Sequence, residues 1–332
     1  MHEADEGSPW LELGTVTCNG NVSCIRFDTV EEVLWAGTHD GRLSSFTMEG
    51  LAKRVSFQAH AKLSPVVEIL PHLEGVLSVS TSGIRFHSRG GLSQLELAEE
   101  VTGINHAVLM DPAGADLILS SHTVLPAKRS KSGASSRLHV YDIETNKMLH
   151  HEVIQEGVTC MSMHPQPLLC CGTMDGNVEV RDPSTFKVIH KALAHGGAVC
   201  DVDVRKNFIV TCGYARHEST EGNFASASNR LDTVVKVFDL RTMKQLPPLA
   251  YRSGAACLRF IPKFSSTLVV ASPGGSFQII DCETQMSDVS SFFTMEAMSG
   301  LTSVTAAPSG ELLAFADDHL VHLWGDGRSE FG

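Results

Sequence analysis

Short runs of alternating apolar and polar residues recur along this chain in a fixed order. The first copy has VSCIRF at 22–27, VLWAGT at 33–38 and RLSSFT at 42–47, with the turn His39-Asp40-Gly41 before the third run. Alternation with a period of two predicts β-strands that bury one face. Asp-Gly favours a two-residue hairpin turn because both types tolerate positive φ. The first copy therefore predicts a three-stranded meander.

The same order returns throughout the sequence. The fourth copy matches the first position by position, with VTCMSM at 158–163, LLCCGT at 168–173, Asp175-Gly176 and NVEVRD at 177–182. The sixth copy runs from CLRFIP to SFQIID, the seventh from LTSVTAAP to LVHLWG, and shorter or interrupted copies occupy 64–91, 101–143 and 199–240. A repeat of roughly 40 to 45 residues with four strands per unit is typical of a β-propeller. The fold expected is all-β, a propeller of about seven blades.

The last copy shows only three strands, so its fourth strand has to come from elsewhere in the chain. LELGTV at 11–16 precedes the first copy and alternates suitably. We expect this segment to complete the last blade and close the ring. The repeats predict one domain over residues 1–328, with residues 329–332 as the start of a truncated linker.

Composition and charge limit the cellular location and the partners expected for this propeller. The chain has 332 residues, 42% of them hydrophobic, and a formal net charge of −12. That charge opposes unaided binding to phosphate backbones, so any nucleic-acid contact has to be local. Nine cysteines lie in apolar runs without a C-x-x-C pair, and no stretch reaches the roughly 18 to 20 apolar residues that span a bilayer. We expect a cytoplasmic protein whose cysteines are small core residues.

Common catalytic motifs are missing from the sequence. It contains no G-x-S-x-G, no G-x-x-x-x-G-K, no G-x-G-x-x-G and no H-E-x-x-H. The densest group of possible metal ligands comprises Asp317, Asp318, His319 and His322. In an extended strand, histidines three residues apart face opposite sides and cannot share an ion. We interpret this group as a turn followed by a strand.

Two other groups of titratable residues also favour a structural interpretation. His150-His151 follows Asn146-Lys147 in an expected loop, where adjacent histidines are solvated. Asp40 and Asp175 precede glycine in hairpin turns, which accounts for them without acid–base chemistry. The sequence therefore offers no catalytic residue, no metal ligand and no cofactor site, although a propeller enzyme with a site in the central channel stays open as a hypothesis.

Two insertions interrupt the repeat. The first, at 125–137, brings Lys128, Arg129, Lys131 and Arg137 into an otherwise acidic protein. It could contact phosphate or an acidic partner, or it could be a solvated loop. The second, at 215–232, is rich in Ser, Asn and Gly with few apolar anchors, so we expect disorder or ordering by a partner.

The segment LRTMKQLPP at 240–248 follows the third run of the fifth copy. Arg241, Met243 and Lys244 precede the pair Pro247-Pro248. Proline fixes an extended path and removes a hydrogen-bond donor, so the segment is expected to present its side chains to a partner without joining a strand ladder. The alternative is an ordinary crossing between blades.

The ends of the third strands resemble the Trp-Asp ends of WD repeats. They read VYD at 140–142, VRD at 180–182, VFD at 237–239, IID at 279–281 and LWG at 323–325. The Gly-His dipeptide of that family occurs only as Ala59-His60 and Ala194-His195. Each sign is weak alone, but their register along the chain favours a seven-bladed WD-repeat β-propeller.

A narrower resemblance covers nearly the whole chain. VFDLRTMKQLPP with the preceding insertion, VLWAGTHDGRLSSF and GGSFQIID are similar to the amino-terminal WD-repeat domain of the catalytic subunits of the Pan poly(A) nucleases. The resemblance implies a non-catalytic scaffold for messenger deadenylation, which helps to dock the Pan adaptor subunit and poly(A)-binding protein on poly(A) RNA. It also implies that the poly(A)-specific 3′ exoribonuclease domain, with its divalent metal ions, lies outside this chain.

Two other functions remain open from the sequence. One is direct RNA binding through Lys128, Arg129 and Lys131, which predicts an affinity that depends steeply on salt. The other is a WD-repeat adaptor of an unrelated complex.

Overall fold

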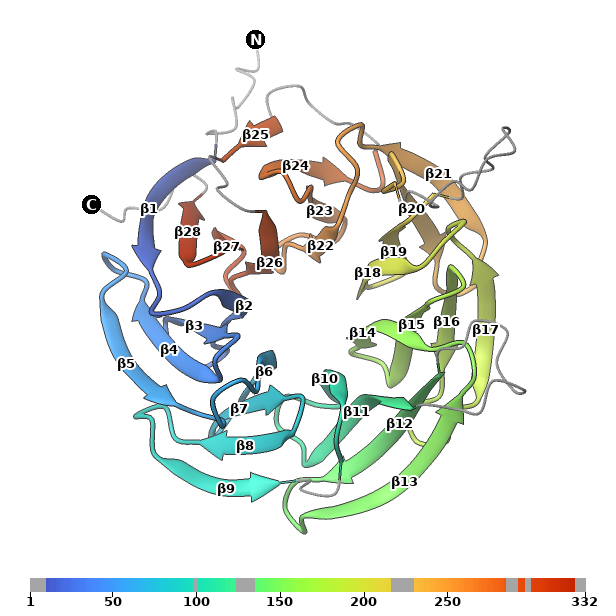
Figure 1. Ribbon diagram of the computed structural model, residues 1–332. Coiled ribbons are helices and arrows are strands. Elements are labelled where there is room, and N and C mark those ends of the chain that lie inside the picture. The colour runs from blue at the N-terminus through green and yellow to red at the C-terminus, as the bar shows by residue number, and fades with distance from the viewer. Residues whose placement is uncertain are drawn as a thin grey trace, which may run out of the picture.

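The computed structural model describes residues 10–97, 101–123, 135–215, 230–284, 292–295 and 300–325. Within these ranges every element of regular secondary structure is a β-strand, and the strands form seven four-stranded antiparallel sheets. The sheets stand around a central opening like the blades of a propeller (Figure 1). The predicted seven-bladed β-propeller is confirmed.

The seven blades follow one another along the chain. Blade 1 has β2 (Val22–Phe27), β3 (Val33–Thr38), β4 (Arg42–Thr47) and β5 (Lys53–Gln58), and blade 2 has β6 (Val66–His72), β7 (Gly75–Ser80), β8 (Gly83–His87) and β9 (Ser93–Leu97). Blade 3 has β10 (Ile104–Leu109), β11 (Asp116–Thr123), β12 (Ser135–Asp142) and β13 (Lys147–Ile154), and blade 4 has β14 (Val158–His164), β15 (Leu168–Thr173), β16 (Asn177–Arg181) and β17 (Val188–Leu193). Blade 5 has β18 (Val199–Arg205), β19 (Phe208–Gly213), β20 (Val234–Asp239) and β21 (Gln245–Ala250), and blade 6 has β22 (Cys257–Phe260), β23 (Thr267–Ala271), β24 (Ser276–Asp281) and β25 (Phe292–Thr294).

Blade 7 joins the two ends of the propeller. It has β26 (Leu301–Ala306), β27 (Leu312–Asp317), β28 (Leu320–Gly325) and, as its outermost strand, β1 (Leu11–Thr17). β1 pairs antiparallel with β28, from Leu11 opposite Gly325 to Thr17 opposite Leu320. The predicted closure by the amino-terminal segment is therefore confirmed. Residues 326–332, which include the expected linker, lie outside the described residues.

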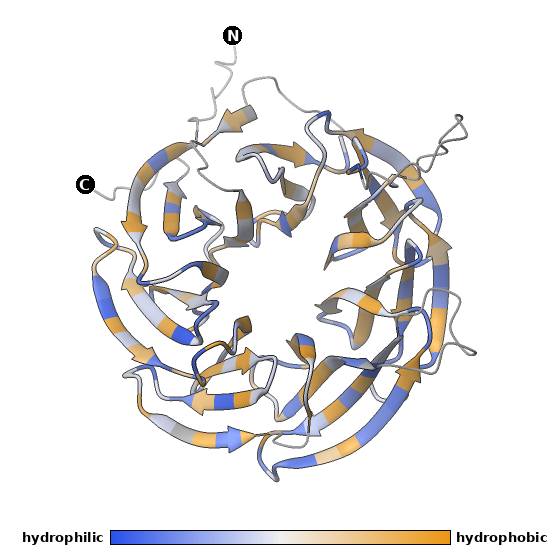
Figure 2. Ribbon diagram, viewed as in Figure 1, coloured by the Kyte–Doolittle hydropathy of each residue, from blue (hydrophilic) through white to orange (hydrophobic). Residues whose placement is uncertain are grey.

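The hydrophobic core is divided among the blade interfaces. Each of the seven buried clusters joins residues of two neighbouring blades, such as Leu34 of blade 1 with Ala314 of blade 7, or Val237 of blade 5 with Leu268 of blade 6. Figure 2 shows apolar and polar residues alternating along many strands. Because each blade buries its faces against its two neighbours, closing the ring gives the first and last blades the same packing as the others.

Most cysteines belong to this core. Seven of the nine are buried, whereas Cys200 and Cys257 are half-buried beside the central channel. Burial raises the pKa of the Cys18 thiol to about 11 and that of the Cys171 thiol to about 12. Thiols that stay protonated at neutral pH are poor nucleophiles and poor metal ligands, which agrees with the predicted packing role.

The hairpin turns between second and third strands use the predicted Asp-Gly pair but in another conformation. Three residues connect the strands in blades 1 and 4, and positive φ is found at the glycine and not at Asp40 or Asp175, so the predicted two-residue turn is wrong. Gly41 and Gly176 have φ of 78° and 84°. The Thr173 hydroxyl donates to Asp175 Oδ1 at 2.5 Å, and Thr38 makes the same contact with Asp40. Burial opposes ionisation of Asp175, but its hydrogen bonds from Thr173 and Asn177 hold the pKa of this carboxyl below its usual range. The aspartates before these glycines are turn residues.

Gly176→Ala is expected to destabilise the protein by about 3 kcal/mol. A Cβ at this position would lie 2.1 Å from the backbone oxygen of His195, in addition to the strain of a positive φ. Gly50→Ala is the matched control, because Gly50 has a φ of 66° but nothing within 4 Å of its Cβ position. Urea unfolding should give a loss of only about 1 kcal/mol for the control. Equal losses would contradict the close packing assigned to Gly176.

Candidate interaction site

The central channel is lined by the innermost strand of every blade and has a volume of about 830 Å3. Arg259 Nη1 lies 2.8 Å from Asp201 Oδ2, which also accepts the backbone N–H of Leu258 at 2.9 Å. Arg26 pairs with Glu68 in the same way across blades 1 and 2. The charged residues of the channel thus link neighbouring blades.

Sequence reasoning missed this polar lining. Asp203 Oδ2 accepts the backbone N–H of Phe260 at 2.8 Å, and burial raises the pKa of Asp203. The sequence contained one indication of this lining, because Arg26 and Arg259 occupy the same position of the repeat in the first and sixth copies. Among the described residues, no group of three or more His, Cys, Asp and Glu side chains is arranged to hold a metal ion.

The two histidines considered as metal ligands have different carboxylate partners. Asp318 has a φ of 47° and begins the turn into β28, and its carboxylate contacts His319 at 3.0 Å. His322 lies in β28, and its Nδ1 is 2.8 Å from Glu12 Oε1 of β1. The turn followed by a strand is confirmed, and His322 contributes to ring closure.

His150 and His151 do not lie in a loop. Asn146, with a φ of 54°, ends the preceding turn, and β13 already begins at Lys147. Both histidines are exposed on this outer strand, and the His150 ring stacks on Phe186 of blade 4 with centroids 5.7 Å apart. The loop prediction is wrong because the turn needs fewer residues than the polar run suggested.

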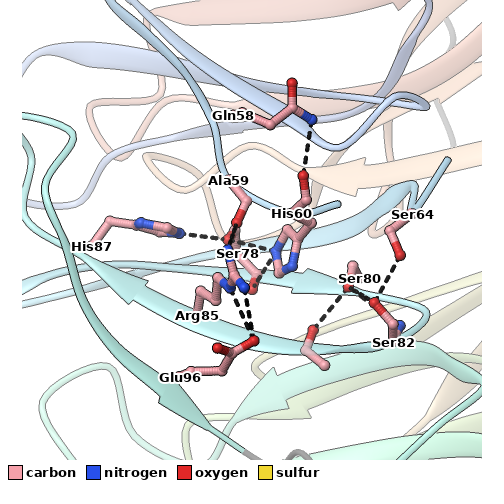
Figure 3. A network of polar contacts seen from close by, with 11 residues as sticks. Gln58, Ala59, His60, Ser64, Ser78, Ser80, Ser82, Arg85, His87 and Glu96 are labelled. Carbon is pink, nitrogen blue, oxygen red and sulfur yellow. Dashed lines mark hydrogen bonds and ion pairs between the residues drawn. The ribbon is translucent and has the colours of Figure 1, made fainter. Parts of the chain in front are cut away.

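Buried histidines link blades through hydroxyl groups. His60 Nε2 lies 2.8 Å from Ser78 Oγ, which lies 2.8 Å from His87 Nε2 (Figure 3). His195 contacts Thr211 of the next blade in the same manner, at 3.1 Å. The histidines of the two Ala-His dipeptides therefore bond to hydroxyl groups of the blade that follows them. Burial lowers the pKa of His60 and of His87 to about 4, so both rings are neutral at physiological pH.

The aspartates at the ends of third strands organise the next turn. Asp142 Oδ1 accepts the backbone N–H of Glu144 at 2.9 Å, and the Thr145 hydroxyl donates to Oδ2 at 2.6 Å. Asp182, Asp239 and Asp281 accept equivalent backbone bonds. The pattern Asp-x-x-Thr-x-Lys spans 142–147, 182–187 and 239–244. The candidate segment of blade 5 thus starts as one of three equivalent turns.

Within that turn the candidate side chains differ in exposure. The Arg241 side chain is 68% exposed, and its Nη2 lies 3.0 Å from Asp239 Oδ2. The Arg241 guanidinium holds the pKa of the Asp239 carboxyl below its usual range. Met243 has a φ of 52° and packs against the cluster between blades 4 and 5, while Lys244 is exposed.

Pro247 and Pro248 lie in β21, the outermost strand of blade 5. The ladder to β20 pairs Leu246 with Val237 and Leu249 with Val235, so the two prolines form a bulge between these pairs. The prediction that 240–248 stays outside a ladder is wrong from Gln245 onward, and the segment does not cross between blades. Prolines are tolerated here because an edge strand and a bulge leave their missing N–H groups unneeded.

Both insertions connect the second and third strands of their blades. Lys128, Arg129 and Lys131 fall at 124–134, outside the described residues, whereas Arg137 lies within β12. Of the second insertion, 216–229 is outside the described residues, and its base is closed by the Ala215 N–H donating to Arg230 O at 2.9 Å. Because the strands of a blade are antiparallel, the turns at Gly41 and Gly176 lie on one face of the propeller, and the Asp-anchored turns lie on the other.

The chain is similar to known proteins in both sequence and fold. The sequence matches the protein family described as PAN2 N-terminal over residues 10–325. The chain belongs to this family. The PAN2-PAN3 deadenylation complex catalytic subunit pan2 of Aspergillus clavatus is 33% identical over 305 residues, which are 91% of this chain and 24% of that protein. Its counterpart from Schizosaccharomyces pombe is 28% identical over 321 residues, 95% of this chain and 27% of that protein.

The match to the PAN2 N-terminal family confirms the resemblance seen in the sequence. The solved structure of the Neurospora crassa Pan2 WD40 domain superposes with a TM-score of 0.82 and 23% identity, covering 98% of this chain and 97% of that chain, so the two share a fold. The chain spans about a quarter of the length of the two relatives named above. No described element is a helix with the length and apolar character needed to span a membrane.

Proposed function

We propose that this chain is a docking platform of a cytoplasmic deadenylation complex and binds the PAN3 subunit of that complex. The observation that carries the proposal is the family match over 10–325, since related catalytic subunits are named for the PAN2-PAN3 complex. The chain itself would be non-catalytic and would need no cofactor. Hydrolysis of poly(A) would belong to the remainder of the relatives' length, with the metal ions implied by the nuclease resemblance.

The Asp-anchored turn of blade 5 is the surface proposed for docking. Arg241 and Lys244 are exposed, Pro247 and Pro248 stiffen the strand that follows, and Met243 fixes the turn against the core. Rigid turns that hold charged side chains lose little entropy on binding, which favours a protein partner. The second partner that we propose for the platform is poly(A)-binding protein on poly(A) RNA, which the assembled deadenylation complex would bind.

Reversing both charges, in R241E/K244E, should weaken PAN3 binding by about tenfold or more, corresponding to about 1.4 kcal/mol. K147E is a matched control, because Glu144 and Lys147 occupy the equivalent places in the turn of blade 3, so the variant carries the same two charges there. Both proteins, prepared with the remainder of the catalytic subunit, would be titrated with PAN3 in the absence of RNA. Unchanged affinity of R241E/K244E, or equal loss in K147E, would remove this surface from the proposal.

A further inference from the structure

The turns between first and second strands of blades 5 and 6 share a face with the Asp-anchored turn of blade 5. The Leu240 N–H, beside Arg241, donates to Asn207 O at 2.7 Å, which joins the two turns of blade 5. Arg205 at the end of β18 reaches the corresponding turn of blade 6, where its Nε donates to Phe264 O at 2.7 Å. Its guanidinium also donates to Pro262 O. These contacts join three turns into one continuous surface.

The turns that carry the cations of this surface are fixed by hydrogen bonds, and three of these cations are not neutralised by carboxylates of the described residues. Lys206 has a φ of 49°, and its backbone oxygen lies 2.8 Å from His164 Nε2 of blade 4. Lys206 and Lys244 are exposed. Within the part of the chain that the structure describes, Arg205, Lys206 and Lys244 have no carboxylate ion-pair partner. The neighbouring Lys263 and Arg241 do pair, with Glu311 and Asp239, so the local charge is positive although the protein is acidic.

An exposed aromatic residue, Phe264, lies on the turn that Arg205 contacts. Phe264 is 43% exposed, which is unusual here because most other phenylalanines in the described residues are buried or half-buried. Its backbone is fixed twice, by the hydrogen bond from Arg205 and by its own N–H to Ile261 O at 3.1 Å. The ring is therefore presented on a rigid turn rather than exposed by a loose one.

We propose that Arg205, Lys206, Lys244 and Phe264 form a binding patch for single-stranded RNA. Proteins bind single strands by placing cations along the phosphates and stacking bases on aromatic rings. An acidic peptide would satisfy the cations but would leave the phenyl ring without a role, whereas a base has a planar face to stack on it.

The patch is tested on the purified chain without any other subunit. A labelled 15-nucleotide oligo(A) is titrated by fluorescence anisotropy from 50 to 200 mM salt, and the logarithm of the binding constant should fall with a slope of roughly −2, since each phosphate contact contributes about 0.7. F264A should weaken binding by about tenfold. K206E should weaken binding and flatten the salt slope, and K206Q should do so to a smaller extent. Oligo(A) is chosen as the probe because of the proposed function, whereas the contacts expected with phosphates and bases would be the same for another single-stranded RNA.

K147E is again the matched control, since it removes an exposed lysine from an equivalent turn on the same face. Full binding by K147E, with loss in F264A and K206E and intact thermal melting of all three, supports the patch. Absence of binding at 50 mM salt, equal loss in K147E, or loss only in a K128A/R129A/K131A variant would overturn it. Competition by a polyglutamate peptide as effective as competition by unlabelled oligo(A) would also overturn it, in favour of an acidic protein ligand. Because R241E/K244E and PAN3 are not used here, failure of the patch and failure of the docking surface are distinguishable.

Discussion

Deleting residues 1–17 is expected to lower the free energy of unfolding by about 5 kcal/mol and to make the protein self-associate. β1 pairs with β28 at six positions, and a backbone hydrogen bond contributes roughly 1 kcal/mol net. The Cys18 N–H, which donates to His319 O at 2.7 Å, and the contact between Glu12 and His322 belong to the same closure. Without β1, strand β28 becomes an open edge with apolar residues, which is a template for pairing with other chains.

Urea unfolding and size-exclusion chromatography of the shortened protein measure these two effects. A synthetic peptide of residues 10–18 added in trans should restore the stability and the monomer, because the edge of β28 is free to accept it. The same peptide with proline at positions 14 and 16 cannot form the ladder and is the control. A shortened protein that is as stable as the full chain, or rescue by both peptides alike, would contradict closure by β1.

Acidification from pH 7.5 to pH 5 is expected to lower the free energy of unfolding by about 6 kcal/mol. Burial lowers the pKa of His60, His87 and His139 to about 4, whereas an unfolded histidine titrates near 6.5. The unfolded chain therefore binds protons that the folded protein does not, and stability falls as pH falls from 6.5 to 4. At pH 5 each ring contributes about 2 kcal/mol of this loss.

His139→Gln separates this effect from general acid sensitivity. His139 Nε2 lies 3.0 Å from Ser121 Oγ, but its Nδ1 is buried and has no hydrogen-bond partner among the described residues, so protonation would add a donor with no acceptor there. Removing the ring should cut the pH-dependent loss by about a third while also lowering stability at pH 7.5. A carboxylate whose pKa is lowered in the folded protein, such as Asp175, stabilises the fold until the pH falls below about 3.8, the pKa of an unfolded aspartate. Such carboxylates therefore do not change the free energy of unfolding between pH 7.5 and pH 5. A pH dependence that stays the same in His139→Gln would contradict the assignment.

The fold was predictable because each local signal agreed with the others. Alternating runs, Asp-Gly turns at Gly41 and Gly176, and the missing fourth strand of the last copy all indicated the same closed ring. The errors concern outer strands. β13 and β21 begin directly after an Asp-anchored turn, and their polar or proline-rich sequences lack the alternation that marks a buried strand. An outer strand has a solvated edge, so its composition is weakly constrained.

The surfaces were less predictable than the fold. Arg241 and Lys244 were recognisable from their sequence, but the contact between Arg205 and Phe264 joins residues 59 positions apart in different blades. The channel pair of Asp201 and Arg259 is hidden for the same reason. The pattern of residues in one sequence predicts strands and turns, which involve neighbours along the chain. Contacts between blades depend on how the repeats pack around the ring, which the pattern does not contain.

The central claim, that this propeller is the docking platform of a deadenylation complex, is tested most directly by cross-linking the intact complex with a lysine-reactive reagent and mapping the products onto this chain. The account predicts cross-links from Lys244 in the Asp-anchored turn of blade 5 to PAN3, and fewer of them when the complex is assembled with R241E, which keeps the reactive lysine. The docking proposal would be contradicted if no cross-link joined Lys244 to PAN3 and all cross-links to PAN3 came from the remainder of the catalytic subunit.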